Sequence, residues 1–385
     1  MRKILLTIPI VIILLVAIAG GYYFLGQQTN NPSQGGPYST PPSEATTVKF
    51  KTASFTDTQG IGTKAFTMLI PSGWQTEGNI RWVLDNPTMP AYGDFRAWNP
   101  NGHEEFHFFE NQAFFASNNP MIQQTFPPGS HYFGALVHEP LGPIDALKEI
   151  ALPKFRSDVQ NLRVINQEEL PQVEKNFQTG TDASGVVISA DAGKIRIEYT
   201  LNGVEMEEEF YCVIQTTDIP IPTVFGTYRN INWYMTYLES FRAEKGKLDA
   251  QSETFQTISY FARTDLNWLN KYNQVVNYLI QQQIQQIQSL GQLSSIVSQT
   301  SSDISDANFE AWQQDQNIKD QLADDFSNSI LGVQSYNNPF DGGTVDLPSG
   351  YSNVWGNSLG EYILSDSASY NPNLESNLNW QQMSP

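Results

Sequence analysis

The order of apolar and polar positions divides the chain into five segments of different texture. They are an apolar segment (1–25), a polar segment (26–47), alternating short runs (48–245), apolar positions spaced three and four residues apart (246–331) and short aromatic-rich runs (332–385). Alternation with a period of two predicts strands, and spacing of three and four predicts helices. We therefore expect an α+β protein whose strands and helices lie largely in separate parts of the chain.

The first segment has the length and composition of a transmembrane helix. Arg2 and Lys3 precede residues 4–25, which contain no charged side chain. A helix of that length spans about 33 Å and can cross a bilayer core of about 30 Å. The next basic residue is Lys49. Positive charge on the N-terminal flank alone predicts a cytoplasmic N-terminus, with the rest of the chain extracytoplasmic or extracellular.

The polar segment 26–47 is expected to link this anchor to the folded part of the chain. Its Gln, Asn, Pro, Ser, Gly and Thr residues cannot bury enough surface to fold, so they predict a flexible linker. A cleaved signal peptide is the alternative for the first segment, with Ala17-Ile18-Ala19 as its small-residue site. The apolar run continues past that site to Leu25, which favours the retained anchor.

Segment 48–245 has the pattern of a mainly antiparallel sheet. Alternating runs such as TVKFKTASF and LRVINQEEL are separated by turn residues. Asn202-Gly203 stands between two such runs and predicts a tight hairpin, and a further turn is expected at residues 191–193. Pro143 is suited to the first turn of a helix, which we expect to run to about Phe155.

The same segment resembles a known family. The stretch LIPSGW at Leu69–Trp74 is followed by a strand, a WNPNG hairpin and a helix expected near residues 234–242. This order is similar to that of the Mog1/PsbP-like α/β/α sandwich, which occurs in many exported bacterial and plastid proteins, and the likeness covers residues 48–245. It implies a binding or assembly module more often than an enzyme. The family has no shared catalytic set to carry over, and a fold alone does not determine function.

Segment 246–331 predicts a helical hairpin. One helix is expected from Asp265 to Gln292 and a second from Ser302 or Asp303 onward, each with one apolar stripe. The stripes contain Leu269, Tyr272, Val276, Ile280, Ile284 and Ile287 in the first helix, and Ile304, Ala311, Ile318 and Leu322 in the second. We expect the stripes to pack on each other or on the sheet. The alternative is an oligomeric or partner coiled coil through residues 265–331.

Segment 332–385 predicts a small aromatic-rich β module, with short strands at TVDLP, SNVWGN and GEYILSD. Its tail resembles those of other exported bacterial proteins. Aromatic side chains bury large areas, so a compact core is the default expectation. The alternative is an exposed surface that stacks on carbohydrate or peptidoglycan. Candidate residues for such an aromatic binding surface are Tyr351, Trp355, Tyr362 and Trp380.

Charge and cysteine content exclude several classes of function. The net charge is −19, and such a surface repels nucleic acid, whose binding depends on Lys and Arg. Cys212 is the only cysteine, so neither an intrachain disulfide nor a thiolate metal cluster can form. The residues around Cys212 have the pattern of a strand interior, where a lone cysteine usually acts as a small buried hydrophobic residue.

The stretch His103-Glu104-Glu105-Phe106-His107 matches the residue pattern of a zinc-metalloprotease motif, with two histidines four residues apart and a glutamate after the first. That motif requires a helix, because only there do its two histidines share one face. The turn residues 100–102 come immediately before, and the aromatic residues that follow favour a strand. On a strand the two histidines would lie about 13 Å apart and could not share one zinc ion.

All four histidines nevertheless fall close together in the sequence, since His131 and His138 follow His103 and His107 on a second expected strand. A metal site could form if these strands pair, although we expect none. Glu205, Glu207 and Glu209 alternate on one strand face beside Glu208, which predicts a solvated edge, with weak Ca²⁺ binding as the alternative. We assign no catalytic, metal or cofactor residues.

These observations predict a single-pass membrane protein with an extracytoplasmic α+β body. The expected function is non-catalytic binding of, or assembly with, a protein or cell-wall partner of the cell envelope or surface, without nucleic acid. The alternative is a zinc-dependent hydrolase that uses His103, Glu104 and His107.

Overall fold

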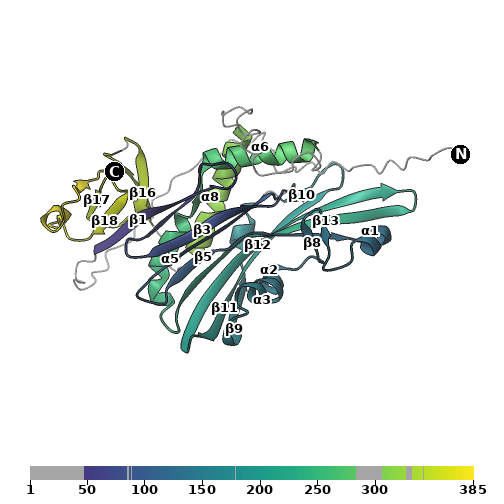
Figure 1. The fold of residues 1–385 in the computed structure, drawn as a ribbon, viewed down its shortest axis with the longest axis horizontal. Helices are drawn as coiled ribbons and strands as arrows, with labels where there is room; N and C mark the ends of the chain where they lie inside the picture. Colours follow the sequence, from purple (N-terminus) through teal and green to yellow (C-terminus); the bar gives the residue numbers. More distant parts are fainter. Residues whose placement is uncertain are drawn as a thin grey trace, which may run out of the picture.

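The structure is a computed structural model that describes residues 47–84, 86–87, 89–177, 179–282, 306–326, 332–340 and 342–385. Two antiparallel sheets, a two-stranded ribbon and a few helices make up these residues (Figure 1). The expected α+β class with mainly antiparallel strands is thereby confirmed. In the described ranges, none of the helices combines the length and apolar character needed to cross a bilayer. The expected anchor, and all but the last residue of the expected linker, lie outside these ranges.

An eleven-stranded sheet, here called the large sheet, is built on three long strands. They are β11 (Val187–Leu201), β12 (Val204–Thr223) and β13 (Gly226–Glu244). The remaining strands are β3 (Gln75–Trp82), β4 (Ala91–Trp98), β5 (Glu105–Phe108), β6 (Gln112–Ser117), β7 (His131–Tyr132), β8 (Ala135–Val137), β9 (Gln160–Glu169) and β10 (Gly180–Thr181). β9 and β10 pair with β11. On the other side, β5 and β6 both pair with β13, and β5 leads on to β4 and β3.

Two turns expected from the sequence have different outcomes. The Asn202-Gly203 turn is confirmed, since both residues have positive φ (51° and 83°) and join β11 to β12. The turn expected at residues 191–193 is wrong, because Gly193 lies inside β11 and pairs with Cys212. A Cβ at Gly193 would lie 3.1 Å from the side chain of Pro143. The glycine therefore allows a helix to approach the sheet closely.

The helix expected at residues 234–242 is also wrong, because this stretch belongs to β13. Tyr237 has a φ of 48° and lies where the register with β12 shifts by one residue. Such a bulge reverses which face of the sheet the following side chains occupy. Trp233 and Met235 lie on one face before the bulge, and Phe241 lies on the other face after it.

A second sheet of six strands, here called the small sheet, joins the two ends of the described chain. Its strand order is β14-β2-β1-β18-β17-β19. The strands are β1 (Thr47–Thr56), β2 (Lys64–Pro71), β14 (Arg263–Thr264), β17 (Asn353–Gly356), β18 (Glu361–Ser365) and β19 (Gln381–Gln382), and β15 (Val333–Asn337) and β16 (Thr344–Pro348) form the ribbon. The three strands expected in the last segment are confirmed. β17 and β18 lie in the same sheet as β1 and β2, so the expected domain boundary at residue 332 falls between strands of one sheet.

Helices cover both faces of the large sheet. The helix expected from Pro143 to Phe155 is confirmed and consists of α2 (Pro143–Ala146), a π-helical turn (Leu147–Ala151) and α3 (Leu152–Phe155). On the opposite face lie α5 (Ser252–Tyr260), α6 (Leu266–Gln282) and α8 (Asp306–Phe326). Shorter helices are α1 (Pro120–Thr125), α4 (Pro171–Glu174) and the 3₁₀ turns η2 (Asp249–Gln251) and η4 (Pro372–Leu374).

Each face of the large sheet has its own hydrophobic core. The first core lies between the large sheet, the small sheet and helices α5, α6 and α8, and the second lies under the helix 143–155. The first contains Met68, Ile70, Phe95, Phe241, Phe255, Val275, Leu279, Ile318 and Leu322, and the second contains Leu147, Leu152, Ile195, Phe210 and Trp233. Ile318 and Leu322 of the second expected stripe pack in the first core, as expected, and Tyr272 of the first stripe packs against it. The α6 residues inside this core, Val275 and Leu279, lie next to the expected stripe positions and not on them. The segment between α6 and α8 lies outside the described residues.

Two buried ionisable groups lie where α8 meets the large sheet. Lys319 of α8 is 2% exposed, and its Nζ donates a hydrogen bond to the carbonyl oxygen of Ala262 at 2.7 Å. Glu239 of β13 is also 2% exposed and accepts a hydrogen bond of 2.7 Å from Ser259 Oγ of α5. Burial raises the pKa of Glu239 to about 7, although Ser259, Lys319 and Arg263 oppose the shift. Burial likewise lowers the pKa of Lys319.

Glu239→Gln should raise the free energy of unfolding more at pH 8 than at pH 5. The pKa of Glu239 is about 7 when folded, against 4.5 for an ordinary glutamate. The folded state therefore holds the proton more tightly, and stability falls as the pH rises from about 4.5 to about 7. Glutamine keeps an acceptor for Ser259 without the charge. Urea unfolding measures the free energy of unfolding of the variant and of the wild type. Their difference should grow by about 1–3 kcal/mol in favour of the variant between pH 5 and pH 8.

Glu198→Gln provides the control. Hydrogen bonds from Arg163 and Lys245 hold the pKa of Glu198 below its usual value, so its stabilising effect is complete above about pH 5 and is lost only in acid. Its effect should therefore stay constant between pH 5 and pH 8. An equal change for both variants would contradict the role assigned to Glu239.

Candidate functional site

The protease-like stretch lies in a hairpin between β4 and β5, as the turn residues before it predict. The backbone N–H of Asn99 donates to the carbonyl oxygen of Glu104 at 2.9 Å, and β5 begins at Glu105. The Asn99 side chain also donates to Glu104 Oε2 at 2.8 Å. The geometry of this stretch is therefore that of a turn followed by a strand, whereas the protease motif depends on a helix.

The two histidines of this stretch have partners on opposite sides of β5. His107 Nε2 lies 2.9 Å from Asp94 Oδ1 of β4, and its ring stacks on Phe109 at 3.8 Å between centroids. His103 Nε2 lies 3.6 Å from Glu244 Oε1 of β13. Since β5 lies between β4 and β13, the two imidazoles point toward different neighbouring strands.

Glu105 belongs to a buried network of charges within the large sheet. It is 6% exposed, and its Oε2 accepts a hydrogen bond from Arg242 at 2.8 Å. Next to this pair, Glu208 is fully buried and binds Arg156 in a two-pronged ion pair. Tyr199 donates a further hydrogen bond of 2.7 Å to Glu208. Burial raises the pKa of Glu208, but the arginines outweigh it and lower the pKa overall.

A small hollow of about 170 Å³ opens beside this hairpin. Its lining residues are Trp98, Asn99, Gly102, His103, Glu104, Glu105, Leu201, Asn202, Met206 and Arg242. The ionisable groups here are engaged in the contacts just described: Glu104 with Asn99, Glu105 with Arg242, and His103 near Glu244. They hold the hairpin against β13, which is a structural role.

The other two histidines lie far along β13 from this hairpin. His107 is opposite Ser240 of β13, whereas the backbone N–H of His138 bonds to Phe115, which is opposite Asn232. Eight residues of strand separate the two positions, which is about 26 Å. His131 lies at the exposed start of β7. Across the parts of the chain that the structure describes, no three His, Cys, Asp or Glu residues are grouped to hold a metal ion.

Of the glutamates near the start of β12, Glu205 is exposed as expected, whereas Glu207 and Glu209 do not belong to a solvated edge. Glu207 and Glu209 are each 8% exposed. Glu207 pairs with Arg196 at 2.7 Å, and Glu209 lies 3.4 Å from Lys194 Nζ. Sequence reasoning missed these pairs because their basic partners lie across the hairpin on β11. Glu207 and Glu209 therefore fasten β12 to β11.

Cys212 is confirmed as a buried residue of a strand interior. It is 0% exposed, and its Sγ donates to the carbonyl oxygen of Pro143 at 3.6 Å. Burial raises the pKa of the Cys212 thiol, and a thiol that stays protonated is a poor nucleophile.

The four aromatic residues that were candidates for the alternative, an exposed binding surface, do not share one exposed face. Tyr362 is 6% exposed and Trp380 is 3% exposed, so both belong to the interior. Trp380 lies beneath Lys49 of β1, whose Nζ is 5.1 Å from the ring centroid. Trp355 and Tyr351 are half-buried. Tyr351 lines a hollow near the end of the chain.

This C-terminal hollow has a volume of about 410 Å³ and lies between β15, β17 and the end of the chain. It is lined by Gln334, Tyr336, Tyr351, Ser352, Asn353, Val354, Gln382, Met383, Ser384 and Pro385. No acidic, basic or histidine side chain is among them. Amides, hydroxyls and two tyrosines therefore set its chemistry, and its volume is in the range of ligand pockets.

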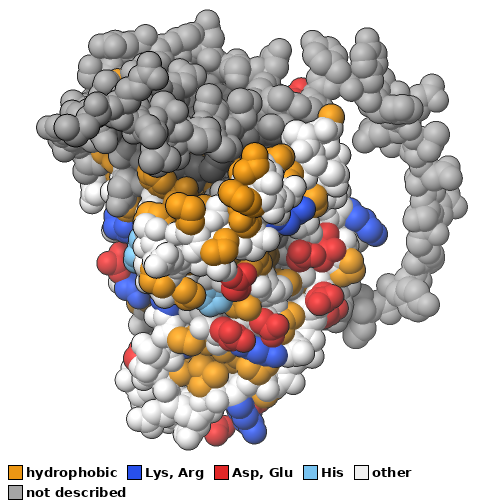
Figure 2. Space-filling model, turned by 90° about the vertical axis from the view of Figure 1, so that its right-hand side faces the viewer, with side chains coloured by type: hydrophobic (Ala, Val, Ile, Leu, Met, Phe, Trp, Pro, Cys, Tyr) orange, Lys and Arg blue, Asp and Glu red, His pale blue; other side chains and the backbone are white. Residues whose placement is uncertain are grey.

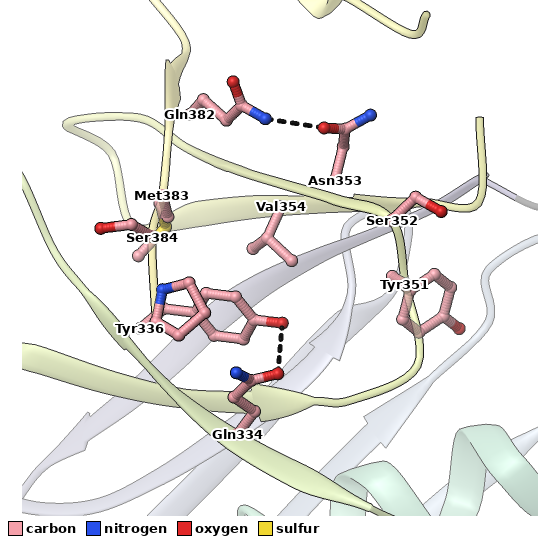
Figure 3. Close-up of a pocket in the computed structure, with 10 residues that line it drawn as sticks. Gln334, Tyr336, Tyr351, Ser352, Asn353, Val354, Gln382, Met383 and Ser384 are labelled. Carbon is pink, nitrogen blue, oxygen red and sulfur yellow. Dashed lines mark hydrogen bonds between the residues drawn. The ribbon is translucent and has the colours of Figure 1, made fainter. Parts of the chain in front are cut away.

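Hydrogen bonds hold the polar lining in place. Gln382 Nε2 donates to Asn353 Oδ1 at 2.7 Å, and Asn353 Nδ2 donates to the carbonyl oxygen of Ser367 at 2.8 Å. Figure 3 shows this pair on one side of the hollow and the Tyr336–Gln334 pair on the other, with Val354 between them. Each of these bonds uses only part of the hydrogen-bonding capacity of an amide.

No family model matches the chain, and no curated protein matches it. The functional interpretation therefore rests on the residues of the chain themselves.

Glu105→Ala should destabilise the fold strongly, whereas Glu104→Ala should not. Removing Glu105 leaves Arg242 buried without its 2.8 Å partner, and breaking a buried pair costs about 3–5 kcal/mol. Glu104 loses one hydrogen bond near the surface, which costs about 1 kcal/mol. Urea unfolding of both variants measures the difference. The alternative, a zinc metalloprotease, makes a different prediction. Glu104→Ala would then abolish proteolytic activity, and elemental analysis of the purified chain would find stoichiometric zinc.

Proposed function

We propose that this chain is a membrane-tethered, extracytoplasmic binding protein of the cell envelope or surface that acts without catalysis. Its ligand is an uncharged, hydroxyl-rich molecule such as a saccharide of a cell wall or cell surface, held in the C-terminal hollow. The observation that carries the proposal is the lining of that hollow, which combines amides, hydroxyls and two tyrosines without any charged side chain.

The lining suits a neutral sugar for two reasons. Sugars present many hydroxyl groups that both donate and accept, and amide side chains offer both functions. A tyrosine ring offers an apolar face against which the C–H side of a sugar ring can pack, with a polar hydroxyl at its tip. Tyr351 is half-buried, so its ring is held in position and still has an open face, whereas Tyr336 is 4% exposed and its ring belongs mainly to the interior.

The tyrosines remain neutral hydroxyls throughout the physiological range. Burial raises the pKa of Tyr336, and burial together with the nearby carboxylates of Glu253 and Asp366 raises the pKa of Tyr351. The side chains that line the hollow therefore keep their charge state over this range. An uncharged ligand matches this environment without losing solvation of an ion.

The resemblance of residues 48–245 to the Mog1/PsbP-like sandwich is a second support for a binding or assembly role. That family provides binding and assembly modules more often than enzymes, although fold-level analogy alone does not determine function. The membrane part of the proposal rests on the apolar residues 4–25 and the single positive flank.

Tyr351→Ala should weaken binding of a neutral oligosaccharide about three- to tenfold, because an aromatic contact contributes about 0.5–1.5 kcal/mol. Tyr351→Phe keeps the ring and should retain most of the affinity. Calorimetric titration of the full chain in detergent with chitotriose and with soluble peptidoglycan fragments measures both. Affinity should be flat between pH 6 and pH 9. Leu374→Ala, which lies outside the hollow and is 83% exposed, is the control, and equal losses for Tyr351 and Leu374 would contradict the site.

A protease added outside intact cells should degrade the folded part of the chain and spare the apolar N-terminal segment. This outcome follows from the cytoplasmic N-terminus that Arg2 and Lys3 predict. Immunoblotting with a C-terminal tag measures it, with a cytoplasmic protein as the control for cell integrity. Full protection of the tag in intact cells, together with its degradation after lysis, would contradict the topology.

A further inference from the structure

The hairpin of β12 and β13 ends in two apolar residues that contact almost nothing else in the protein. Val224 is 93% exposed and Phe225 is 89% exposed. Thr223 closes the turn, because its Oγ1 donates to the carbonyl oxygen of Gly226 at 2.7 Å and accepts from the N–H of Phe225 at 3.2 Å. The turn is therefore fixed in a conformation that presents both apolar side chains to the outside.

Other exposed apolar residues lie at the same end of the large sheet. Met121 of α1 is 78% exposed, and Phe133 between β7 and β8 is 60% exposed. This end is tied together because the N–H of Arg229 near the hairpin tip donates to the side chain of Asn118, just before α1, at 2.7 Å. In Figure 1, α1 lies beside the hairpin at the right-hand end. Figure 2, which faces this end, shows several groups of exposed hydrophobic side chains on the described surface.

The hairpin tip and the segment around α1 carry no charge of their own in a chain whose net charge is −19. Residues 219–228 of the hairpin contain no charged side chain, and neither do residues 111–130, which include α1. Arg229 and Asp218 flank the tip and neutralise each other in a pair at 2.7 Å. An apolar tip without surrounding charge can leave water without desolvating ions.

Two prolines limit how the edge of this hairpin can pair. Pro220 and Pro222 lie on β12 just before the tip, opposite Arg229 and Thr227. A proline has no N–H to donate, so it is tolerated in a strand only where that position points away from the neighbouring strand. At Pro220 and Pro222 the outer edge of β12 therefore has no backbone N–H to offer. Another strand would find few hydrogen-bond donors there, so this edge is a poor template for strand pairing.

We propose that this tip, formed by Val224 and Phe225, inserts into the interface of the same lipid bilayer that holds the N-terminal anchor. A convex apolar tip fits a deformable lipid surface without requiring a preformed pocket in a partner. Aromatic and aliphatic side chains favour that interfacial depth. This inference rests on the membrane-tethered part of the proposed function and is independent of the C-terminal hollow.

The length of the linker allows both contacts at once. The 21 residues before β1, 26–46, can extend to about 71 Å at about 3.4 Å per residue. β12, the longest strand of the large sheet, has 20 residues and spans about 66 Å. The anchor can therefore lie at a distance from β1 that is comparable with the length of the large sheet.

A fluorescent label beside the tip tests the inference. Thr227→Cys carries an environment-sensitive NBD probe in the full chain, reconstituted into phosphatidylcholine vesicles with nitroxide-labelled lipid. The native Cys212 is 0% exposed and does not compete for the label. The probe should show blue-shifted emission and quenching by the nitroxide at low and high salt alike. Val224→Ser with Phe225→Ser should lower the inserted fraction roughly tenfold or more, and Leu374→Ser should leave it unchanged.

The outcomes separate this inference from the anchor. If the chain floats with the vesicles but the probe stays in a polar environment, the tip proposal is overturned and the anchor stands. If the chain does not float and the probe is unquenched, both are overturned. Quenching that survives the double serine substitution also overturns the proposal. A blue shift that grows with the protein-to-lipid ratio would assign the tip to a second copy of the chain and overturn the lipid assignment.

Discussion

The pairing of β12 with β13 is the constraint on which the rest of the structure depends. The ladder runs from Met206 opposite Glu244 to Thr223 opposite Gly226. Because one bulge at Tyr237 reverses the facing of side chains along β13, a single strand supplies Trp233 to one core and Phe241 to the other. Both helical layers therefore pack on the same pair of strands, and a shift of register there would expose both cores at once.

Local features were predictable from the sequence, and features that depend on distant partners were not. The Asn202-Gly203 turn and the helix at Pro143 are specified by residues next to one another. The bulged strand was mistaken for a helix near residues 234–242. Its apolar residues at 233, 235, 238 and 241 are spaced by two, three and three, which approaches the spacing of a helix. The pairing of β1 with β18 joins residues more than 300 positions apart (for example Thr47 and Ser365), which no local pattern reveals.

The same distinction applies to the candidate site. The turn before His103 was enough to predict a strand in place of a protease helix. The role of Glu105 could not be predicted, because its partner Arg242 is 137 residues away. Among the aromatic candidates, composition could not separate Tyr351, which reaches a hollow, from Trp380, which is buried. Charges of the large sheet such as Glu105, Glu207 and Glu208 hold parts of the fold together, and the ligand and lipid contacts that we propose lie elsewhere, at surfaces lined by uncharged side chains.

The pairing of β1 with β18 also has a mechanical consequence. β1 is the first described strand after the expected linker, and β18 lies between β1 and β17 in the small sheet. The hollow takes Asn353 and Val354 from β17. A load applied between a bound ligand and the membrane would pass through β17, β18 and β1, and would bypass the large sheet (Figure 1). A protein attached to both a cell wall and a membrane could thus transmit tension through a few short strands, with the second core, under the helix 143–155, outside the path.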